Sequence, residues 1–219
     1  MRKKEPEINL HLGCSLQAMR EMKDNQYDLA IIDPPYGINM GKDMATGWAS
    51  RQSNTKFSVK NWDSDIPSEE YFKELFRVSK NQIIWGGNYF IKYLSNTRCF
   101  IVWDKNNGES FFADGELAWT SFDKVVKIAR INWAGGSSYL EDTKGKIHPT
   151  QKPIELYKYC LEKFAKDGDK ILDTHLGSGS IACACYDLGF DLDAWEIDKD
   201  YYRDTLVRYN NYSKQIKLF

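Results

Sequence analysis

The chain has 219 residues, 42% of them hydrophobic, and a formal net charge of −1. This length and composition suit one well-buried domain and leave little room for two. No apolar run approaches the roughly 18 residues that span a bilayer, and no hydrophobic signal core follows Met1, so we expect a cytoplasmic protein without membrane association. Five cysteines without metal-ligand spacing predict reduced thiols and no metal site.

In chain order, short apolar runs that stop at Gly, Pro or Asp alternate with helical patterns. These runs predict strands at 27–33, 83–85, 99–103, 116–120, 170–173 and 192–197. Helices are predicted at 68–78, at 154–165 with Pro153 in its first turn, and at 181–188. Strands that alternate with helices in this way predict an α/β sheet with both faces covered.

Two stretches, 37–64 and 123–147, interrupt this pattern and carry little apolar periodicity. Loops of this length in a compact domain are usually functional or disordered. Basic residues gather in or beside them, although the net charge of the whole chain attracts no polyanion. Such strips can hold a phosphate backbone, and ordinary solvated loops are the alternative. The basic residues are Lys42, Arg51, Lys56, Lys60, Lys124, Lys127, Arg130, Lys144, Lys146 and Lys152.

The most informative motif is Asp33-Pro34-Pro35-Tyr36, which follows a predicted buried strand. The carboxyl ends of strands in an open α/β sheet form the ligand crevice. Two prolines fix the backbone and remove two N–H donors, so the Asp33 carboxylate and the Pro34 carbonyl can converge as acceptors. Two acceptors beside the flat ring of Tyr36 suit a planar aromatic amine. A rigid Pro-Pro turn with a packed tyrosine is the structural alternative.

A second motif lies between the strand that ends at Asp173 and the helical run from 181. Its turn, Gly177-Ser178-Gly179, allows close approach of a cofactor to the backbone, and a helix N-terminus follows. Glu196 ends the next strand, where an acid can accept hydrogen bonds from both hydroxyls of a ribose. An adenosine-containing cofactor is therefore predicted.

The spacing alone leaves a nicotinamide dinucleotide open, because the glycine turn also satisfies the looser dinucleotide fingerprint. Asp173 argues against it, since an acid before the turn would repel a pyrophosphate but can engage the amino group of a methionine moiety. The chain after Glu196 is also too short to complete a dinucleotide half-domain.

With these motifs in this order, the chain resembles the β group of DNA amino-methyltransferases, the circularly permuted class in which Asp-Pro-Pro-Tyr precedes the glycine turn. The segment 148–153, His-Pro-Thr-Gln-Lys-Pro, resembles a cofactor-associated segment of that family. Blocks 77–90, 100–105 and 114–121 are similar to blocks of phage-type and stand-alone adenine methyltransferases. The resemblance covers about residues 8–208.

The resemblance implies a Rossmann-like, doubly wound sheet of the class I methyltransferase type, with seven strands, one of them antiparallel. It implies one domain over 1–219, a small target-recognition insertion around 123–147 and a long DNA-facing loop around 37–64. The implied cofactor is S-adenosylmethionine and the implied partner is DNA, expected to be double-stranded, for a monomer or homodimer.

Site roles also follow from the resemblance. Asp33 and the Pro34 carbonyl would hold the target amine, in the tetrapeptide that Pro35 completes, while Tyr36 would stack on a flipped base. The cofactor would be held by Asp173, Gly177, Ser178, Gly179 and Glu196, with Thr150 and Lys152 near its carboxylate. Where the family often has an acid near the adenine amine, this chain has Cys14. Ser15 or a backbone carbonyl could replace that contact, and Cys14 itself is expected to be a small buried residue.

The resemblance favours methyl transfer to N6 of adenine, because cytosine-specific members more often have Ser at the position of Asp33. Three alternatives stay open: N4 of cytosine in DNA, adenine in RNA, and a non-catalytic nucleic-acid-binding protein. A flipped adenine looks alike in DNA and RNA.

Overall fold

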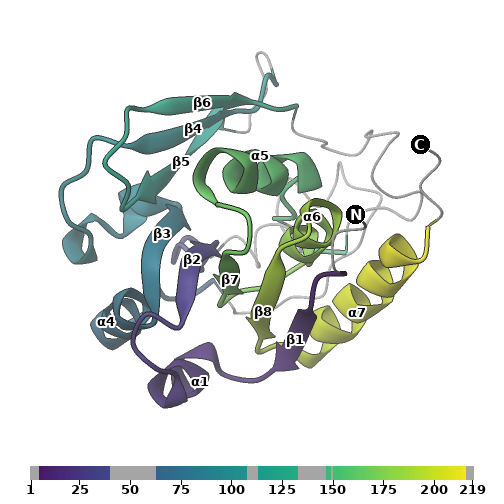
Figure 1. The fold of residues 1–219 in the computed structure, drawn as a ribbon. Helices are drawn as coiled ribbons and strands as arrows, with labels where there is room; N and C mark the ends of the chain where they lie inside the picture. Colours follow the sequence, from purple (N-terminus) through teal and green to yellow (C-terminus); the bar gives the residue numbers. More distant parts are fainter. Residues whose placement is uncertain (1–4, 40–62, 108–112, 133–146, 149, 216–219) are drawn as a thin grey trace.

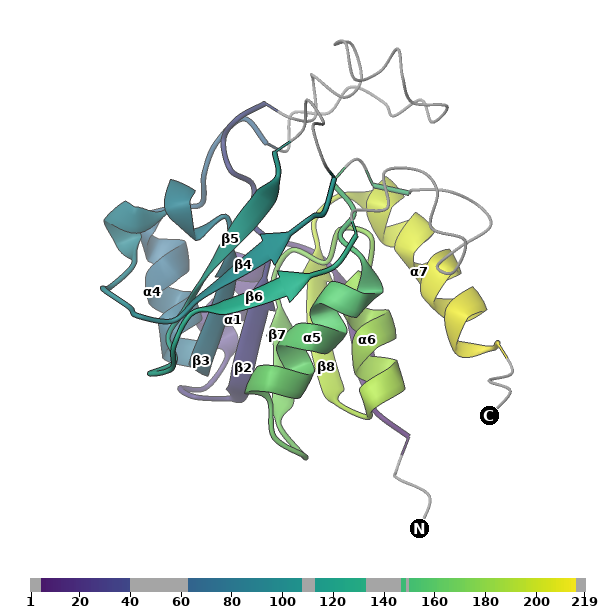
Figure 2. The ribbon, with the colours of Figure 1, turned by 90° about the horizontal axis from the view of Figure 1, so that it is seen from above.

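The computed structural model describes residues 5–39, 63–107, 113–132, 147–148 and 150–215, which form one mixed sheet with helices on both faces (Figures 1 and 2). Its eight strands are β1 (Ile8–Leu12), β2 (Tyr27–Ile32), β3 (Ser79–Trp85), β4 (Phe100–Asp104), β5 (Gly115–Thr120), β6 (Lys127–Arg130), β7 (Lys170–Asp173) and β8 (Asp191–Glu196). The helices are α1 (Ser15–Glu21), α4 (Glu69–Val78), α5 (Ile154–Phe164), α6 (Ser180–Leu188) and α7 (Lys199–Ser213), with short 3-10 helices η1 (Gly87–Tyr89) and η2 (Ile91–Tyr93). Within these ranges we find no helix with the length and apolar character of a membrane span.

The strand order is β1-β8-β7-β2-β3-β5-β4-β6. β5 runs antiparallel to both β3 and β4, and the other neighbouring pairs are parallel. The predicted doubly wound mixed sheet with one antiparallel strand is therefore confirmed.

The sheet has eight strands where the resemblance implied seven. β6, at one edge, lies in the stretch 123–147 that the sequence marks as irregular, and only its Ala129 is buried. β1, at the other edge, is also absent from the predicted strands. Edge strands bury few side chains, so their sequence pattern is weak. The rest of that stretch from 133, and most of the predicted loop 37–64, lie outside the described residues.

The central strand β2 is buried on both faces, which explains its continuous apolar run. Leu29 and Ile31 belong to the core beneath α5 and α6. Ala30 and Ile32 belong to the core on the opposite face, beneath α1 and α4. Because both faces of β2 are packed, the end of this strand is held rigidly in the molecule.

The three predicted helices are confirmed as α4, α5 and α6, with small differences at their ends. α4 begins after Ser68, whose hydroxyl accepts a hydrogen bond from the Tyr71 amide at 3.2 Å. Pro153 is the N-cap of α5 and lies just before its first turn. The helices α1 and α7 are additions to the predicted set.

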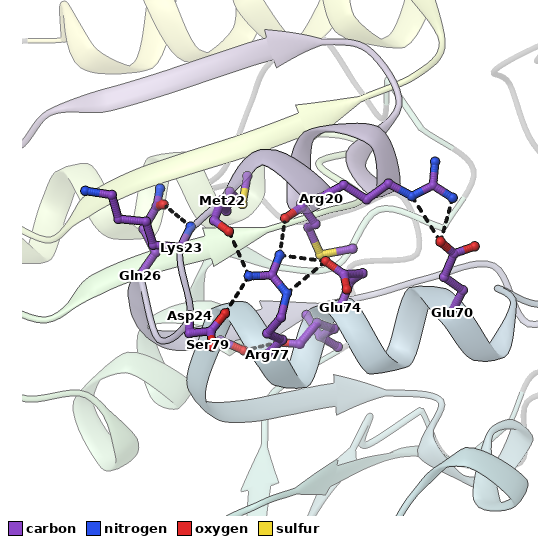
Figure 3. Close-up of polar contacts among 11 residues, drawn as sticks. Arg20, Met22, Lys23, Asp24, Gln26, Glu70, Glu74, Arg77 and Ser79 are labelled. Atoms are coloured by element: carbon purple, nitrogen blue, oxygen red, sulfur yellow. Dashed lines mark hydrogen bonds and ion pairs between the residues drawn. The ribbon is translucent and has the colours of Figure 1, made fainter.

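Arg77 on α4 binds the end of α1 through several hydrogen bonds (Figure 3). The guanidinium group of Arg77 donates to the carbonyl oxygens of Met19 and Met22, each at 2.7 Å. It also donates to Asp24 Oδ1 at 2.7 Å and to Glu74 Oε2 at 2.6 Å. These bonds satisfy carbonyl groups at the end of α1, which has only seven residues and little stability of its own.

We predict that Arg77→Gln lowers the melting temperature, because it leaves the end of α1 without its partner. The matched control is Arg20→Gln on the same pair of helices, since Arg20 makes one half-exposed ion pair with Glu70 at 2.6 Å. Exposed pairs of that kind contribute little, so the control should shift the melting temperature by at most about 4 °C and by less than Arg77→Gln does. Calorimetry measures both, and equal shifts would contradict the role given to Arg77.

Candidate functional site

The two motifs meet at the point where the sheet reverses its direction of winding. From β7 the chain proceeds through α6 to β8 on one side, and from β2 it proceeds through α4 to β3 on the other. β2 and β7 are parallel neighbours, with Leu29 opposite Ile171 and Ala30 opposite Leu172. Their carboxyl ends therefore bring Asp33 close to Asp173, at the switch point where α/β sheets bind ligands.

The side chain of Asp33 is held at both of its oxygens. Tyr36 donates its hydroxyl hydrogen to Asp33 Oδ1 at 2.6 Å, and Lys152 Nζ donates to Oδ2 at 2.5 Å. The Asp33 side chain is 17% exposed and that of Lys152 is 5% exposed. Since each carboxylate oxygen has two lone pairs, each can still accept a second hydrogen bond from a ligand.

A second carboxylate, Asp63, fixes the backbone that follows the prolines. Its Oδ1 accepts from the amide of Tyr36 at 2.6 Å and from the amide of Gly37 at 2.9 Å. Asp63 is buried. The sequence analysis missed it because it lies in an irregular stretch with no motif around it, and the contact spans 27 positions.

The ring of Tyr36 packs on the turn that follows β3. Gly86 has φ of +68°, and a Cβ placed on it would lie 2.2 Å from Tyr36 Cε1. Three residues further on, Tyr89 stacks on Tyr36, with ring centroids 4.9 Å apart and ring planes inclined by 13°. Tyr89 is 43% exposed. The tetrapeptide and the turn at 86–89 thus form one aromatic surface beside Asp33.

Lys152 also contacts Glu116, which extends the buried charges across the sheet. Glu116 Oε2 lies 3.1 Å from Lys152 Nζ, and Glu116 Oε1 lies 2.8 Å from Lys105 Nζ. Burial opposes ionisation of Glu116, but Lys152 and Lys105 outweigh it and lower its pKa to about 2.

Burial and neighbouring charges shift the pKa values of Asp33 and Lys152. Burial raises the pKa of Asp33, and its single ammonium neighbour only partly offsets that. For Lys152, burial acts against the ammonium form, but Asp33 and Glu116 together raise its pKa above the ordinary value. Lys152 is therefore a firmly charged group between two carboxylates. The place of Lys152 near a cofactor carboxylate stays a prediction, and its burial between two carboxylates removes it from the basic strip proposed for phosphate contact.

The glycine turn after β7 is built around two buried acids. Asp173 Oδ1 accepts from the amide of His175 at 2.9 Å, and burial raises the pKa of Asp173 to about 8. Glu196 Oε2 accepts from the amide of Gly177 at 2.9 Å, and burial raises its pKa as well. Gly177 and Gly179 have φ of +52° and +73°, values that favour glycine.

Glu196 lies in the wall of a pocket of about 240 Å³. Thr174 and His175 from the loop after β7 line the same pocket, and Pro35 brings the tetrapeptide to it. The remaining walls come from the start of α1, the segment before α4 and the residue after β8: Gly13, Cys14, Ser15, Leu16, Asp65, Ile66, Pro67, Ser68, Tyr71 and Ile197.

Three further observations concern the predicted cofactor residues. Ser178 is buried, with its hydroxyl 3.3 Å from Ser180 Oγ and its carbonyl bound by Arg208 at 2.7 Å, so it supports the turn from behind. Thr150 Oγ1 lies 3.1 Å from His148 Nδ1. Cys14 is partly exposed in the pocket wall, which differs from its expected burial.

His175 and Tyr71 are pocket residues that the sequence analysis did not assign. The Tyr71 hydroxyl lies 2.5 Å from Thr174 Oγ1, which lies 3.0 Å from His175 Nδ1. Burial lowers the pKa of His175 to about 4, so its ring is neutral near pH 7. Tyr71 lies in the first turn of α4 and belongs to no recognisable sequence motif. Only the packing of α4 against the loop after β7 could therefore show that it lines the pocket.

We predict that Gly86→Ala is more damaging than Gly168→Ala. Both glycines have positive φ, +68° and +88°, so both substitutions carry a backbone strain of about 1 kcal/mol. A Cβ at Gly168 meets no atom within 4 Å, whereas a Cβ at Gly86 collides with the Tyr36 ring. The melting temperature should fall further for Gly86→Ala, and equal falls would argue against close packing of Tyr36 on this turn.

Comparison with known proteins finds similarity in the region that contains the glycine turn. A family model described as DNA methylase, N6_N4_Mtase, matches residues 133–207, which include the glycine turn and Glu196. The type II methyltransferase M.HpaI of Haemophilus parainfluenzae is 26% identical over 236 residues, covering 89% of this chain and 72% of that protein.

Solved structures share the whole fold. The crystal structure of the M1.HpyAVI–SAM complex has a TM-score of 0.60 and 19% identity, covering 93% of this chain and 99% of that one. The PvuII DNA methyltransferase, described as cytosine-N4-specific, has a TM-score of 0.60 and 12% identity, covering 96% and 95%. The chain therefore has the α/β fold of the class I methyltransferases.

Proposed function

We propose that this chain is an S-adenosylmethionine-dependent DNA methyltransferase that modifies N6 of a flipped adenine. The observation that carries the proposal is the meeting of two sites at the switch point between β2 and β7. Asp33 has carboxylate oxygens that can each accept a further hydrogen bond, and it lies two residues before Pro35, which lines the pocket whose wall contains Glu196. One site suits an aromatic amine and the other suits an adenosine.

The comparisons support the reaction class. The matched family model is described as DNA methylase, and M.HpaI is a type II methyltransferase. M1.HpyAVI, which shares the fold, was solved with SAM. The order of the motifs, with the tetrapeptide strand before the glycine-turn strand, favours the circularly permuted β group.

The residues present fit this cofactor. Glu196 Oε1 and Oε2 each accept one backbone hydrogen bond, so each keeps a lone pair for a ribose hydroxyl. Asp173, whose pKa burial raises to about 8, gains most from a nearby ammonium group such as that of a methionine moiety. Gly177 and Gly179 allow close approach of the backbone. Ser15 and Asp65 both line the pocket and supply oxygen acceptors where the family often has an acid at position 14.

When bound, S-adenosylmethionine supplies an electrophilic methyl group on a sulfonium, and the carbon–sulfur bond breaks as the carbon–nitrogen bond forms and the nitrogen releases a proton. An aromatic amine is a poor nucleophile because its lone pair is delocalised into the ring. Asp33 and the Pro34 carbonyl accept hydrogen bonds from the two N–H groups of the amine and so direct its lone pair out of the ring plane. Tyr36 stacks on the flipped base, which offsets part of the cost of unpairing it.

We favour adenine on two grounds. Asp33 supplies a carboxylate where cytosine-specific relatives of the resembled family more often have Ser, and a purine gives Tyr36 a larger stacking area. The likeness to the cytosine-N4-specific PvuII enzyme makes N4 of cytosine the second candidate.

The product decides between these bases. Purified protein should transfer radiolabelled methyl groups to double-stranded DNA, and nucleoside digestion with mass spectrometry should show N6-methyladenine. N4-methylcytosine as the sole product would overturn the base assignment. Transfer to RNA but not to DNA would overturn the substrate class, and no transfer to either would refute the enzyme proposal.

The two sites should separate in mutants. Asp33→Asn should lower transfer by about 100-fold or more while cofactor affinity stays near that of the wild type, because its charge acts on the amine. Glu196→Gln should weaken cofactor binding instead, because it replaces a carboxylate that faces the pocket. Calorimetric titration beside the transfer assay measures both, with the exposed substitution Glu155→Gln as control. Full transfer activity in Asp33→Asn would rule out the proposed mechanism.

A further inference from the structure

Glu116 lies at the candidate active site because β5 is antiparallel to its neighbours β3 and β4. In a sheet with only parallel strands, the residues near the catalytic edge are those at carboxyl ends. β5 instead begins at that edge, with Glu116 opposite Trp103 near the end of β4. Lys105 follows the end of β4. The antiparallel strand thus places an acid beside two lysines, one of which holds Asp33.

These side chains form a continuous row of contacts. Its distances are 2.8 Å from Lys105 to Glu116, 3.1 Å from Glu116 to Lys152, 2.5 Å from Lys152 to Asp33 and 2.6 Å from Asp33 to Tyr36. The side chains of Lys105 and Lys152 are 8% and 5% exposed, and that of Glu116 is 24% exposed. The row contains two ammonium groups and two carboxylates, so its charges balance.

The contact of Glu116 with Lys152 is an ion pair between two largely buried side chains. Glu116 Oε2 is buried, and Lys152 Nζ lies 3.1 Å from it. Burial of a carboxylate costs free energy, and here Lys152 and Lys105 offset that cost, since together they lower the pKa of Glu116 to about 2. Packing alone gives no reason for it, because an apolar side chain at position 116 would avoid the cost together with that of burying Lys105.

The effect on Asp33 gives a reason. If Asp33 were the only carboxylate beside Lys152, the ammonium group would pair with Asp33 alone. That stronger pairing would make Asp33 a weak hydrogen-bond acceptor for a ligand. With Glu116 on its other side, Lys152 is shared, and the negative charge of Glu116 also raises the pKa of Asp33. Both effects leave Asp33 a better acceptor for an amine hydrogen.

We propose that Glu116 is a positioning residue for the methyl transfer, which acts through Lys152 to keep the Asp33 carboxylate a strong acceptor for the target amine. The proposal rests on the proposed function. Lys105 has a supporting part, because it neutralises Glu116 and lies 5.1 Å from the centre of the Trp103 ring. Glu116 itself is not among the described residues that line the pocket beside Glu196.

The test uses the full chain and three variants. Glu116→Gln removes the charge and keeps the shape. Glu116→Asp keeps the charge on a shorter side chain. The double variant Glu116→Gln with Lys105→Met removes one charge of each sign and so restores the balance of the row. Glu155→Gln, which removes an exposed carboxylate on α5, is the control. For each variant we would measure kcat against pH, cofactor affinity by calorimetry, and melting temperature.

In Glu116→Gln, kcat should fall by about tenfold or more, because Lys152 then pairs with Asp33 alone and makes Asp33 a weaker acceptor for the amine. The acid limb of the pH profile should move to lower pH, since loss of a negative neighbour lowers the pKa of Asp33. The other charged or titratable groups around Asp33 are unchanged: Lys152, Tyr36, Asp173 at the end of β7 and Tyr157 on α5. Cofactor affinity should stay within about twofold of wild type.

The double variant distinguishes positioning from simple structural support. We expect it to regain melting temperature but to keep the low kcat and the shifted acid limb, whereas Glu116→Asp should keep the acid limb near that of the wild type. Recovery of kcat together with stability in the double variant would overturn the proposal. A wild-type profile in Glu116→Gln would also overturn it. A wild-type chain that transfers no methyl group would instead refute the proposed function.

Discussion

The parallel pairing of β2 with β7 is the constraint on which the site depends. These strands are about 140 positions apart in the chain, yet Leu29 lies opposite Ile171 and Ala30 opposite Leu172. Because both strands run the same way and are buried on both faces, their carboxyl ends cannot separate without unpacking the core. The acid that would act on the amine and the acids that would hold the cofactor are therefore held in one crevice.

The pairing also explains the unusual density of buried charge. Asp33, Asp173 and Glu196 all end or follow central strands and are shielded from water, which disfavours their ionised forms. Each finds a different compensation: an ammonium group for Asp33, a backbone amide for Asp173, and two backbone amides for Glu196. These differences divide the crevice into a part suited to an amine and a part suited to a cofactor.

The pocket wall depends in turn on helices packed on the opposite face from α5 and α6. The start of α1 and the segment before α4 both line the pocket, and Arg77 joins the end of α1 to α4 (Figure 3). A helix of seven residues gains little from its own hydrogen bonds, so this tie keeps Cys14 and Ser15 at the pocket. Tyr71 on α4 reaches Thr174 beneath the same wall. Stability and function are thus linked through one short helix.

The sequence by itself determined the α/β class, the central strands and helices, and the position of the two motifs at the ends of strands, because these depend on local periodicity and on residue types at strand ends. It did not reveal the edge strands β1 and β6, whose few buried side chains leave a weak pattern. Nor could it reveal the bond of Asp63 with the Tyr36 amide across 27 positions, or the contact of Lys152 with Asp33. The antiparallel direction of β5 decided that Glu116 faces Lys152. Contacts of this kind depend on how distant strands pair, and pairing is set by the packing of the whole core, so only the tertiary structure could decide them.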